Sequence, residues 1–249
     1  MLLLPQQIFF RSLHLTIRPS TLLLLATMPK LTKRSATNLN LNNLTDNQYP
    51  PSSSVPSFLA SPLPKLIVFD LDYTLWPFWV DTHVTAPLKP SPNAPTSAAL
   101  DRYGESFAFY DDVPAILQSL PRAGVRTAVA SRTSAPTLAK NLLKILHLPA
   151  QAAEAPGDER SKPAVNARKA IDAFDAGMEI YPSCKIKHFE AIHKRTGVRY
   201  EDMLFFDDEA RNRDTETLGV TMYLVRDGVT WSEVEKGVKE WRRRRGFGA

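Results

Sequence analysis

The amino-acid sequence predicts an α/β fold in which helices flank a central parallel β-sheet. Short apolar runs, rich in β-branched and aromatic residues, recur along residues 64–249, and amphipathic stretches lie between several of them. Such runs are typical of strands buried on both faces of a parallel sheet. Because a helix between two strands returns the chain to the same end of the sheet, parallel pairing is the expected arrangement.

Residues 1–63 differ in composition from the rest of the chain. They are poor in acids, and residues 35–63 are rich in Ser, Asn and Pro without helical or strand periodicity. We predict a disordered N-terminal extension that also serves as a possible targeting segment. In its scarcity of acids the extension resembles a mitochondrial transit peptide. The alternative is that translation starts at Met28, and in that case we expect a cytoplasmic protein.

The net charge of +5 is concentrated in this extension. Residues 1–63 carry five basic residues against the single acid Asp46, a net charge of +4, which leaves +1 for the rest. We therefore expect no nucleic-acid partner. Arg11 and Arg18 interrupt the apolar N-terminal stretch, so we expect no membrane span. The single cysteine, Cys184, excludes an internal disulfide and agrees with a reducing compartment. We expect the protein to be a monomer.

The predicted domain, residues 64–249, begins with a strand over residues 65–70. Residues 76–109 are expected to form a long loop excursion, because they are rich in Pro and Ser and keep no sustained period. A helix is expected over residues 113–123, with Asp112 as its N-cap and Gly124 at its end. The next strand covers residues 125–130.

A helix with an apolar stripe is expected over residues 135–148. Residues 149–176 contain few large apolar residues, and we predict a flexible insert with a short helix at residues 165–174. The run of four arginines near the C-terminus is interpreted as a solvated helix end, with an anionic-surface or nuclear signal as the alternative. The remaining expected elements are a strand at 177–181, a helix at 185–196, strands at 203–206 and 219–225, and a helix from residue 231 onward.

Polar residues follow three of the predicted strands. Asp70 and Asp72 follow the first, Ser131 and Arg132 follow the second, and Asp207-Asp208 end the strand at 203–206. A parallel sheet brings such strand ends to one edge, where ligands bind. Carboxylates from two strands can share Mg²⁺, which prefers oxygen ligands. Zinc is disfavoured because Cys and His residues are scattered.

These residue types fit phosphoryl transfer. Asp70 can act as a nucleophile that forms an aspartyl phosphate, and Asp72 as a general acid and then a general base. Ser131 can donate a hydrogen bond to a phosphoryl oxygen, and Lys185, at the start of its helix, can add positive charge. An isolated pair of aspartates would give only weak support for phosphoryl transfer. Here the strand-end serine, the lysine and the second pair of acids follow the first pair in that order along the chain, which makes the pattern more specific.

The set DLDYT, a strand-end Ser, a helix-opening Lys and FFDD resembles the four motifs of the haloacid dehalogenase superfamily. More narrowly, FDLDYTLWPFWVDTHV, ASRTS, EIYPSCKIKHFE and MLFFDDEARN resemble the eukaryotic magnesium-dependent phosphatase family, from about residue 65 to residue 228. The resemblance implies a Rossmann-like domain without a large cap and a dependence on Mg²⁺. It also implies hydrolysis of small phosphate esters of the sugar-phosphate type, or of phosphotyrosyl proteins.

The resemblance also implies roles for individual residues. It makes Asp70 the nucleophile and a metal ligand, and Asp72 the acid/base and a ligand through its backbone oxygen. Asp208 would be the second-strand ligand; Asp207 is the competing choice and would otherwise orient Lys185. The residues expected to hold the phosphate are Leu71, Asp72, Ser131, Arg132 and Lys185. The sequence departs from the family in residues 1–63 and in the longer insert at 149–176.

Several alternatives stay open. The same fold could support a phosphotransferase or mutase, or a receiver-like domain that binds Mg²⁺ without catalysis. Trp76, Phe78 and Trp79 either line a substrate entrance or pack the loop. Cys184, next to Lys185, is either inert or a redox-sensitive thiol.

Overall fold

The computed structural model describes residues 56–60, 62–149 and 167–247. All of them belong to one compact unit, Asp46–Ala249, whereas the second unit, Met1–Thr45, lies outside the described residues. Most of the predicted N-terminal extension and most of the predicted insert at 149–176 therefore fall outside them as well.

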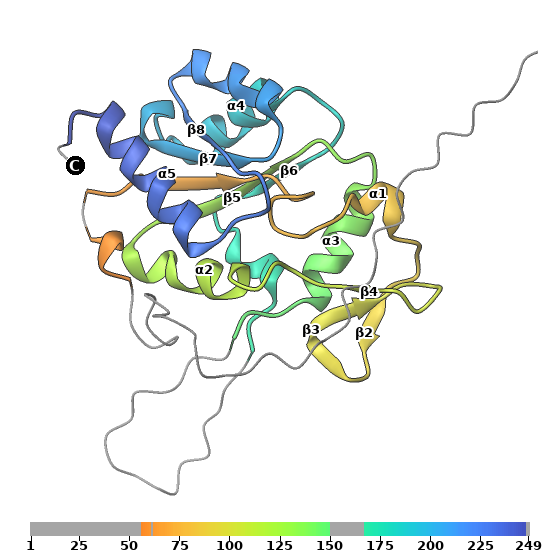
Figure 1. The fold of residues 1–249 in the computed structure, drawn as a ribbon. Coiled ribbons are helices and arrows are strands. Elements are labelled where there is room, and N and C mark those ends of the chain that lie inside the picture. Colours follow the sequence, from red (N-terminus) through yellow and green to blue (C-terminus); the bar gives the residue numbers. More distant parts are fainter. Residues whose placement is uncertain (1–55, 61, 150–166, 248–249) are drawn as a thin grey trace, which may run out of the picture. The chain divides into compact units, whose positions relative to one another are not determined.

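A five-stranded parallel sheet forms the centre of the described unit, in the order β6-β5-β1-β7-β8 (Figure 1). This confirms the predicted fold class. The strands, all close to their predicted positions, are β1 (Leu66–Phe69), β5 (Arg126–Ser131), β6 (Met178–Ile180), β7 (Met203–Asp207) and β8 (Thr221–Leu224). The chain runs from β1 outward to β5 and β6, and then returns to add β7 and β8 on the other side. The strand order thus reverses beside β1, which is where open α/β sheets bind ligands.

The two faces of the sheet bury two apolar clusters. Alternate residues of β1 divide between them: Ile67 and Phe69 belong to the larger cluster, Leu66 and Val68 to the smaller one. The larger cluster includes residues of α2 (Val113–Ser119), α3 (Pro136–Ile145) and α5 (Trp231–Arg244), and the smaller one includes residues of α4 (Lys185–Thr196). All four residues of β1 are fully buried, so both faces of the strand must be apolar.

Helix α5 packs closely on β7. A Cβ atom on Gly237 would lie 2.6 Å from Cζ of Phe206, so only glycine allows this approach. The helix α4 begins and ends at its predicted residues, and Gly197 closes it with a φ of 68°. None of the helices in the described ranges has the length and apolarity needed to cross a bilayer.

Asp112 lies at the predicted N-cap position of α2, but it does not serve as the capping side chain there. Its side chain makes no capping hydrogen bond to α2, and Oδ2 instead accepts a hydrogen bond of 3.0 Å from the backbone N–H of Trp231, at the start of α5. Asp112 itself has helical backbone angles, φ −79° and ψ −22°, whereas an N-cap residue is usually extended. The carboxylate therefore joins the first turns of two helices that are far apart in sequence.

Residues 76–109 are not a simple loop. They contain α1 (Val80–His83) and an antiparallel sheet of β2 (Lys89–Ser91), β3 (Ala94–Leu100) and β4 (Ser106–Phe107). The register shifts between Pro90 and Ser91. Short strands that contain prolines and a bulge do not produce a sustained alternation of apolar and polar residues.

The domain includes residues before the predicted boundary at residue 63. A short 3₁₀ helix, η1, covers Ser57–Leu59, and Leu59 is buried in the larger apolar cluster. The other 3₁₀ helices are η2 (Pro121–Ala123), η3 (Ala170–Ala173), η4 (Tyr200–Asp202) and η5 (Ala210–Leu218).

The arginine run of α5 is not merely a solvated end. Arg242 donates hydrogen bonds to the backbone oxygens of Pro62 (2.8 Å), Phe58 (2.9 Å) and Ala60. Arg245 donates to the backbone oxygens of Glu201 and Gly219, both at 2.6 Å. These arginines therefore fix chain segments that lie far from them in sequence.

Arg242→Ala is expected to lower the free energy of unfolding by about 2 kcal/mol, because three carbonyl groups lose a charged donor. The matched control is Arg243→Ala, since Arg243 is exposed and pairs only with Glu240 among the described residues. Loss of an exposed ion pair should change stability little. Urea unfolding of both variants tests this, and equal midpoints would contradict the role given to Arg242.

Candidate active site

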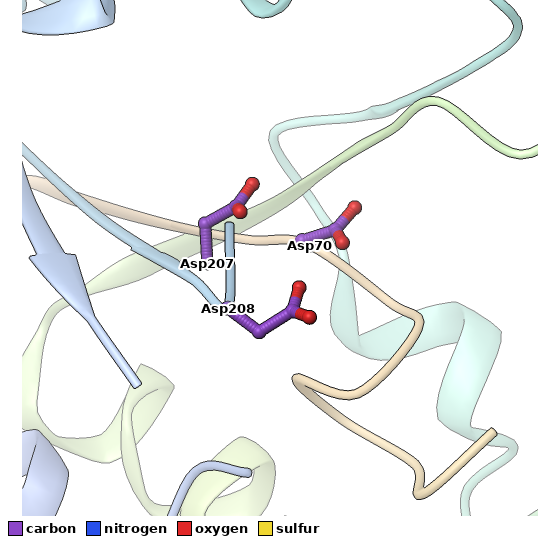
Figure 2. Close-up of side chains that lie close together, drawn as sticks. All are labelled: Asp70, Asp207 and Asp208. Carbon is purple, nitrogen blue, oxygen red and sulfur yellow. The ribbon is translucent and has the colours of Figure 1, made fainter. Parts of the chain in front are cut away.

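Three carboxylates meet at the carboxyl ends of β1 and β7, where the strand order reverses. Asp70 directly follows β1, Asp207 is the last residue of β7, and Asp208 follows it. One oxygen from each lies within 4.8 Å of the other two, and Figure 2 shows the three side chains at these strand ends. The predicted meeting of strand ends is confirmed for these residues.

Lys185 lies against two of these carboxylates. Its Nζ is 2.7 Å from Oδ1 of Asp70 and 3.0 Å from Oδ2 of Asp207, and it also donates to the backbone oxygen of Ala130. The lysine is 1% exposed, although it is the first residue of α4. A buried ammonium group requires such partners, so the first turn of α4 is fixed to the ends of β1 and β7.

The structure separates the two neighbouring acids of β7. Asp207 is fully buried, and its carboxylate accepts hydrogen bonds from the side-chain amide of Asn212 (2.9 Å to each oxygen) and from the backbone N–H of Glu209 (2.7 Å). Asp208 is partly exposed and lines the pocket beside Asp70. Asp207 is thus held by protein donors, whereas Asp208 faces the space that a ligand would enter.

Burial disfavours the charged forms of the acids at this edge. It raises the pKa of Asp70 to about 8, although Lys185 opposes the shift and Asp207 adds to it. Burial and the neighbouring Asp207 raise the pKa of Asp208 to about 6. For Lys185 burial alone would lower the pKa, but Asp70 and Asp207 outweigh it and raise it. A further positive charge beside Asp70 and Asp208 would stabilise both carboxylates.

Asp72 is held by the segment that follows β1. Its Oδ1 accepts hydrogen bonds from the indole N–H of Trp76 (2.7 Å) and from the backbone N–H of Val80 (3.2 Å). Burial raises the pKa of Asp72 to about 6, although the hydrogen bond from Trp76 lowers it. Trp76 therefore has a polar role in addition to packing on Phe78.

Asp70, Asp72 and Asp208 line a pocket of about 340 Å³, and residues that end or follow β5 line it too. Ser131 is 1% exposed, and its Oγ lies 3.4 Å from the backbone nitrogen of Thr133. Arg132 lines the same pocket and donates to the side-chain oxygen of Asn212 at 3.3 Å. The structure thus brings Asp70, Asp72, Ser131, Arg132 and Asp208 to one pocket. Leu71 is fully buried between the two acids.

Sequence reasoning missed part of this pocket. Asp81, in α1, accepts hydrogen bonds from the hydroxyl (2.8 Å) and backbone N–H (3.1 Å) of Ser134, and so joins α1 to the turn before α3. The sequence also contains no sign that Asn212 would donate to both carboxylate oxygens of Asp207. Thr82, Thr133, Glu209 and Arg211 also line the pocket. The contact between Asp81 and Ser134 has no signal in the local pattern, because the two residues lie 53 positions apart in sequence.

The aromatic residues before α1 divide between the two predicted roles. Trp76 and Phe78 are buried, whereas Trp79 is 50% exposed and lines the pocket. The Trp79 ring stacks on His83 at 5.7 Å and meets Tyr73 edge-on at 5.1 Å.

Cys184 is exposed at the N-terminus of α4.

The donor set fits a hard divalent cation. All three side chains of the cluster offer carboxylate oxygens, and Mg²⁺ is typically held by one or two carboxylates together with water and phosphate oxygens. No thiol or imidazole belongs to the cluster, so it does not resemble a zinc site.

Comparison with known proteins agrees with this chemistry. The family model described as Acid Phosphatase matches residues 62–244. A Schizosaccharomyces pombe protein named as a member of the HAD-like hydrolase superfamily is 47% identical over 158 residues, which cover 64% of this chain and 83% of that protein. Magnesium-dependent phosphatase 1 of Homo sapiens is 39% identical over 178 residues, 71% of this chain and 86% of that protein. The chain therefore belongs to the magnesium-dependent phosphatase family of the haloacid dehalogenase (HAD) superfamily.

Proposed function

We propose that the protein is a Mg²⁺-dependent phosphatase that hydrolyses phosphate monoesters through an aspartyl-phosphate intermediate. The observation that carries the proposal is the position of Asp70, whose carboxylate lies against Lys185 and beside Asp208 at the carboxyl edge of the sheet. Asp72 lines the same pocket. One carboxylate is thus available to attack phosphorus and a second to transfer a proton.

In the first step, an oxygen of Asp70 attacks the phosphorus atom, and the bond between phosphorus and the leaving-group oxygen breaks. Asp72 gives its proton to that oxygen. In the second step, Asp72 takes a proton from water, the water oxygen attacks the aspartyl phosphate, and inorganic phosphate leaves with Asp70 restored.

Mg²⁺ would be held by Asp70, by Asp208 and by the backbone oxygen of Asp72. When bound, it neutralises negative charge on the phosphoryl oxygens. Asp207, already engaged by Asn212 and Lys185, orients the lysine instead.

The phosphate would be held by the Ser131 hydroxyl, Arg132 and the backbone N–H groups of Leu71 and Asp72. Lys185, whose three donors bind Asp70, Asp207 and the backbone oxygen of Ala130, would add positive charge behind Asp70. Trp79, exposed at the pocket, would contact the leaving group. We propose phosphotyrosyl or sugar-phosphate esters as substrates; a screen of both classes would distinguish a protein-tyrosine-phosphatase from an enzyme that acts on sugar phosphates.

The proposal is tested by the response of Asp72→Asn to the leaving group. With Mg²⁺ present, we expect the variant to hydrolyse phenyl phosphate about 10²–10⁴-fold more slowly than wild type. With 2,4-dinitrophenyl phosphate the loss in the rate of phenolate release should be much smaller, because this leaving group departs without a proton. Single-turnover release of the phenol from both esters gives the comparison, because it reports the first step alone.

Two controls accompany this experiment. Wild type with a chelator in place of Mg²⁺ should release no phosphate above background. Asp81→Asn changes an acid of the same pocket that we assign no proton transfer, so its rate should depend on the leaving group as that of wild type does. Equal losses of Asp72→Asn with both esters would refute the assignment of Asp72 as the acid.

A further inference from the structure

A second hollow lies away from the pocket that contains Asp70. It has a volume of about 730 Å³ and lies between strand β8 and helix α5. It shares no lining residue with the pocket of Asp70 and Asp208. We call it the β8–α5 groove. It is defined by Met222–Leu224, by the face of α5 that carries Lys236, Lys239 and Arg243, and by Arg213 and Arg226.

The groove runs along an edge of the sheet. Strand β8 is the last in the strand order and pairs only with β7 among the described strands. The three consecutive residues Met222, Tyr223 and Leu224 all line the groove. Because successive side chains of a strand point to opposite faces, three in a row can line one groove only at the strand's edge. Half of the backbone groups of an edge strand point away from its neighbour and can pair with another extended chain.

One end of this edge is already closed. The Arg245 guanidinium donates to the backbone oxygen of Gly219 at 2.6 Å, just before β8 begins. The groove lies beyond that point, toward the C-terminal end of the strand.

The charge of the groove indicates what would occupy it. Seven of its eleven lining residues are Lys or Arg, and Glu240 is the only acid among them. Arg242 is held by the backbone oxygens of residues 58–62, and Arg213, Lys236 and Arg244 pair with acids outside the groove. Two further bases form exposed ion pairs: Lys239 with Glu235 at 2.7 Å, and Arg243 with Glu240 at 2.8 Å. The Lys239 and Arg243 side chains remain 62% and 71% exposed. Exposed pairs contribute little to stability, so these bases can turn to an acidic ligand at low cost.

Arg226 adds to the positive charge of the groove. It is exposed, and no acid in the described part of the chain lies within ion-pair distance of it. On the strand side of the groove, Tyr223 and Leu224 are half-buried and largely apolar, so an occupant with apolar side chains between its acids would be complementary to both parts.

We propose that the β8–α5 groove binds an extended acidic segment of a partner protein, which pairs with the free edge of β8 and places its carboxylates against α5. A peptide is favoured over nucleic acid because the edge offers the hydrogen-bonding pattern of a strand. The domain outside residues 1–63 also has a net charge of only +1, which does not produce the extended positive field of a nucleic-acid surface.

The test uses the full chain and a short fluorescein-labelled peptide in which Glu alternates with Val, measured by fluorescence anisotropy. We expect saturable binding that weakens as salt is added. The double variant Arg226→Glu, Lys239→Glu should bind about tenfold more weakly or worse. The matched control is Lys194→Glu, an exposed lysine of α4 that lies outside the groove, and it should bind as wild type does.

A second peptide isolates the strand pairing. N-methylation of alternate amides keeps every charge but removes the donors to β8, and we expect binding to be lost. Failure of the first peptide to bind, equal affinity of the double variant, or undiminished binding of the methylated peptide would overturn the proposal. So would tighter binding of a single-stranded oligonucleotide. All variants should keep the wild-type rate with aryl phosphates and the wild-type melting temperature, and peptide binding does not depend on that activity.

Discussion

Asp70→Asn is expected to reduce the turnover of aryl phosphate hydrolysis by about 10⁴-fold or more, because an amide oxygen cannot replace the carboxylate as nucleophile. The substitution keeps the shape of the side chain. It also removes a negative charge from a site where burial disfavours that charge. Lys185 keeps Asp207 as its charged partner, and the amide oxygen can still accept its hydrogen bond. The variant should therefore fold with a melting temperature close to that of wild type.

The measurement is the single-turnover release of phosphate with Mg²⁺, together with mass spectrometry of the acid-quenched protein. Wild type should carry a labile phosphoryl group on the peptide that contains Asp70, and the variant should carry none. Full activity in Asp70→Asn would exclude this residue as the nucleophile.

Lys185→Met is expected to affect both stability and activity. Methionine fills much of the same volume, but Asp70 and Asp207 lose the ammonium group that lies between them. Removing one partner of a buried ion pair costs about 3–5 kcal/mol. We also expect kcat/KM to fall about 10²–10³-fold, because a positive charge near the phosphoryl oxygens is lost.

Lys187→Met is the matched control, since Lys187 lies two residues along the same helix and is exposed. Urea unfolding, kcat/KM, inhibition by inorganic phosphate and the Mg²⁺ concentration for half-maximal activity should be measured for both. For Lys185→Met, phosphate inhibition should weaken more than the Mg²⁺ requirement rises. An unchanged KM and turnover would remove Lys185 from the site.

Local sequence signals predicted the sheet because its strands are short and its central strands are mostly apolar. The residues of β1 and β7 are buried on both faces, so their positions follow from composition alone. The same reasoning failed for β2–β4, where prolines and a register shift interrupt the alternation. It also failed for Asp112, because a favourable N-cap residue can equally well bind a helix that lies elsewhere in the fold.

The site was predictable where strand ends carry its residues. The parallel sheet brings Asp70, Ser131 and Asp208 to one edge whatever the details of packing. The sequence could not decide between Asp207 and Asp208, because both follow the same apolar run. The difference arises from Asn212 and Lys185, which reach Asp207 from two other elements. Contacts such as that between Asp81 and Ser134 have no local signal at all.

Helix α5 joins parts of the domain that are made at very different times during synthesis. Its first N–H is bound by Asp112, its Arg242 holds residues 58–62, and Gly237 lies against Phe206. A chain still on the ribosome has no α5 until residues 231–244 have been made. Until then the part of the sheet that α5 covers stays open, although α2 and α3 pack on the same face, and η1 lacks its anchor. The domain therefore completes its core only when α5 has left the ribosome. A nascent or truncated chain that ends before Trp231 would expose this face to chaperones.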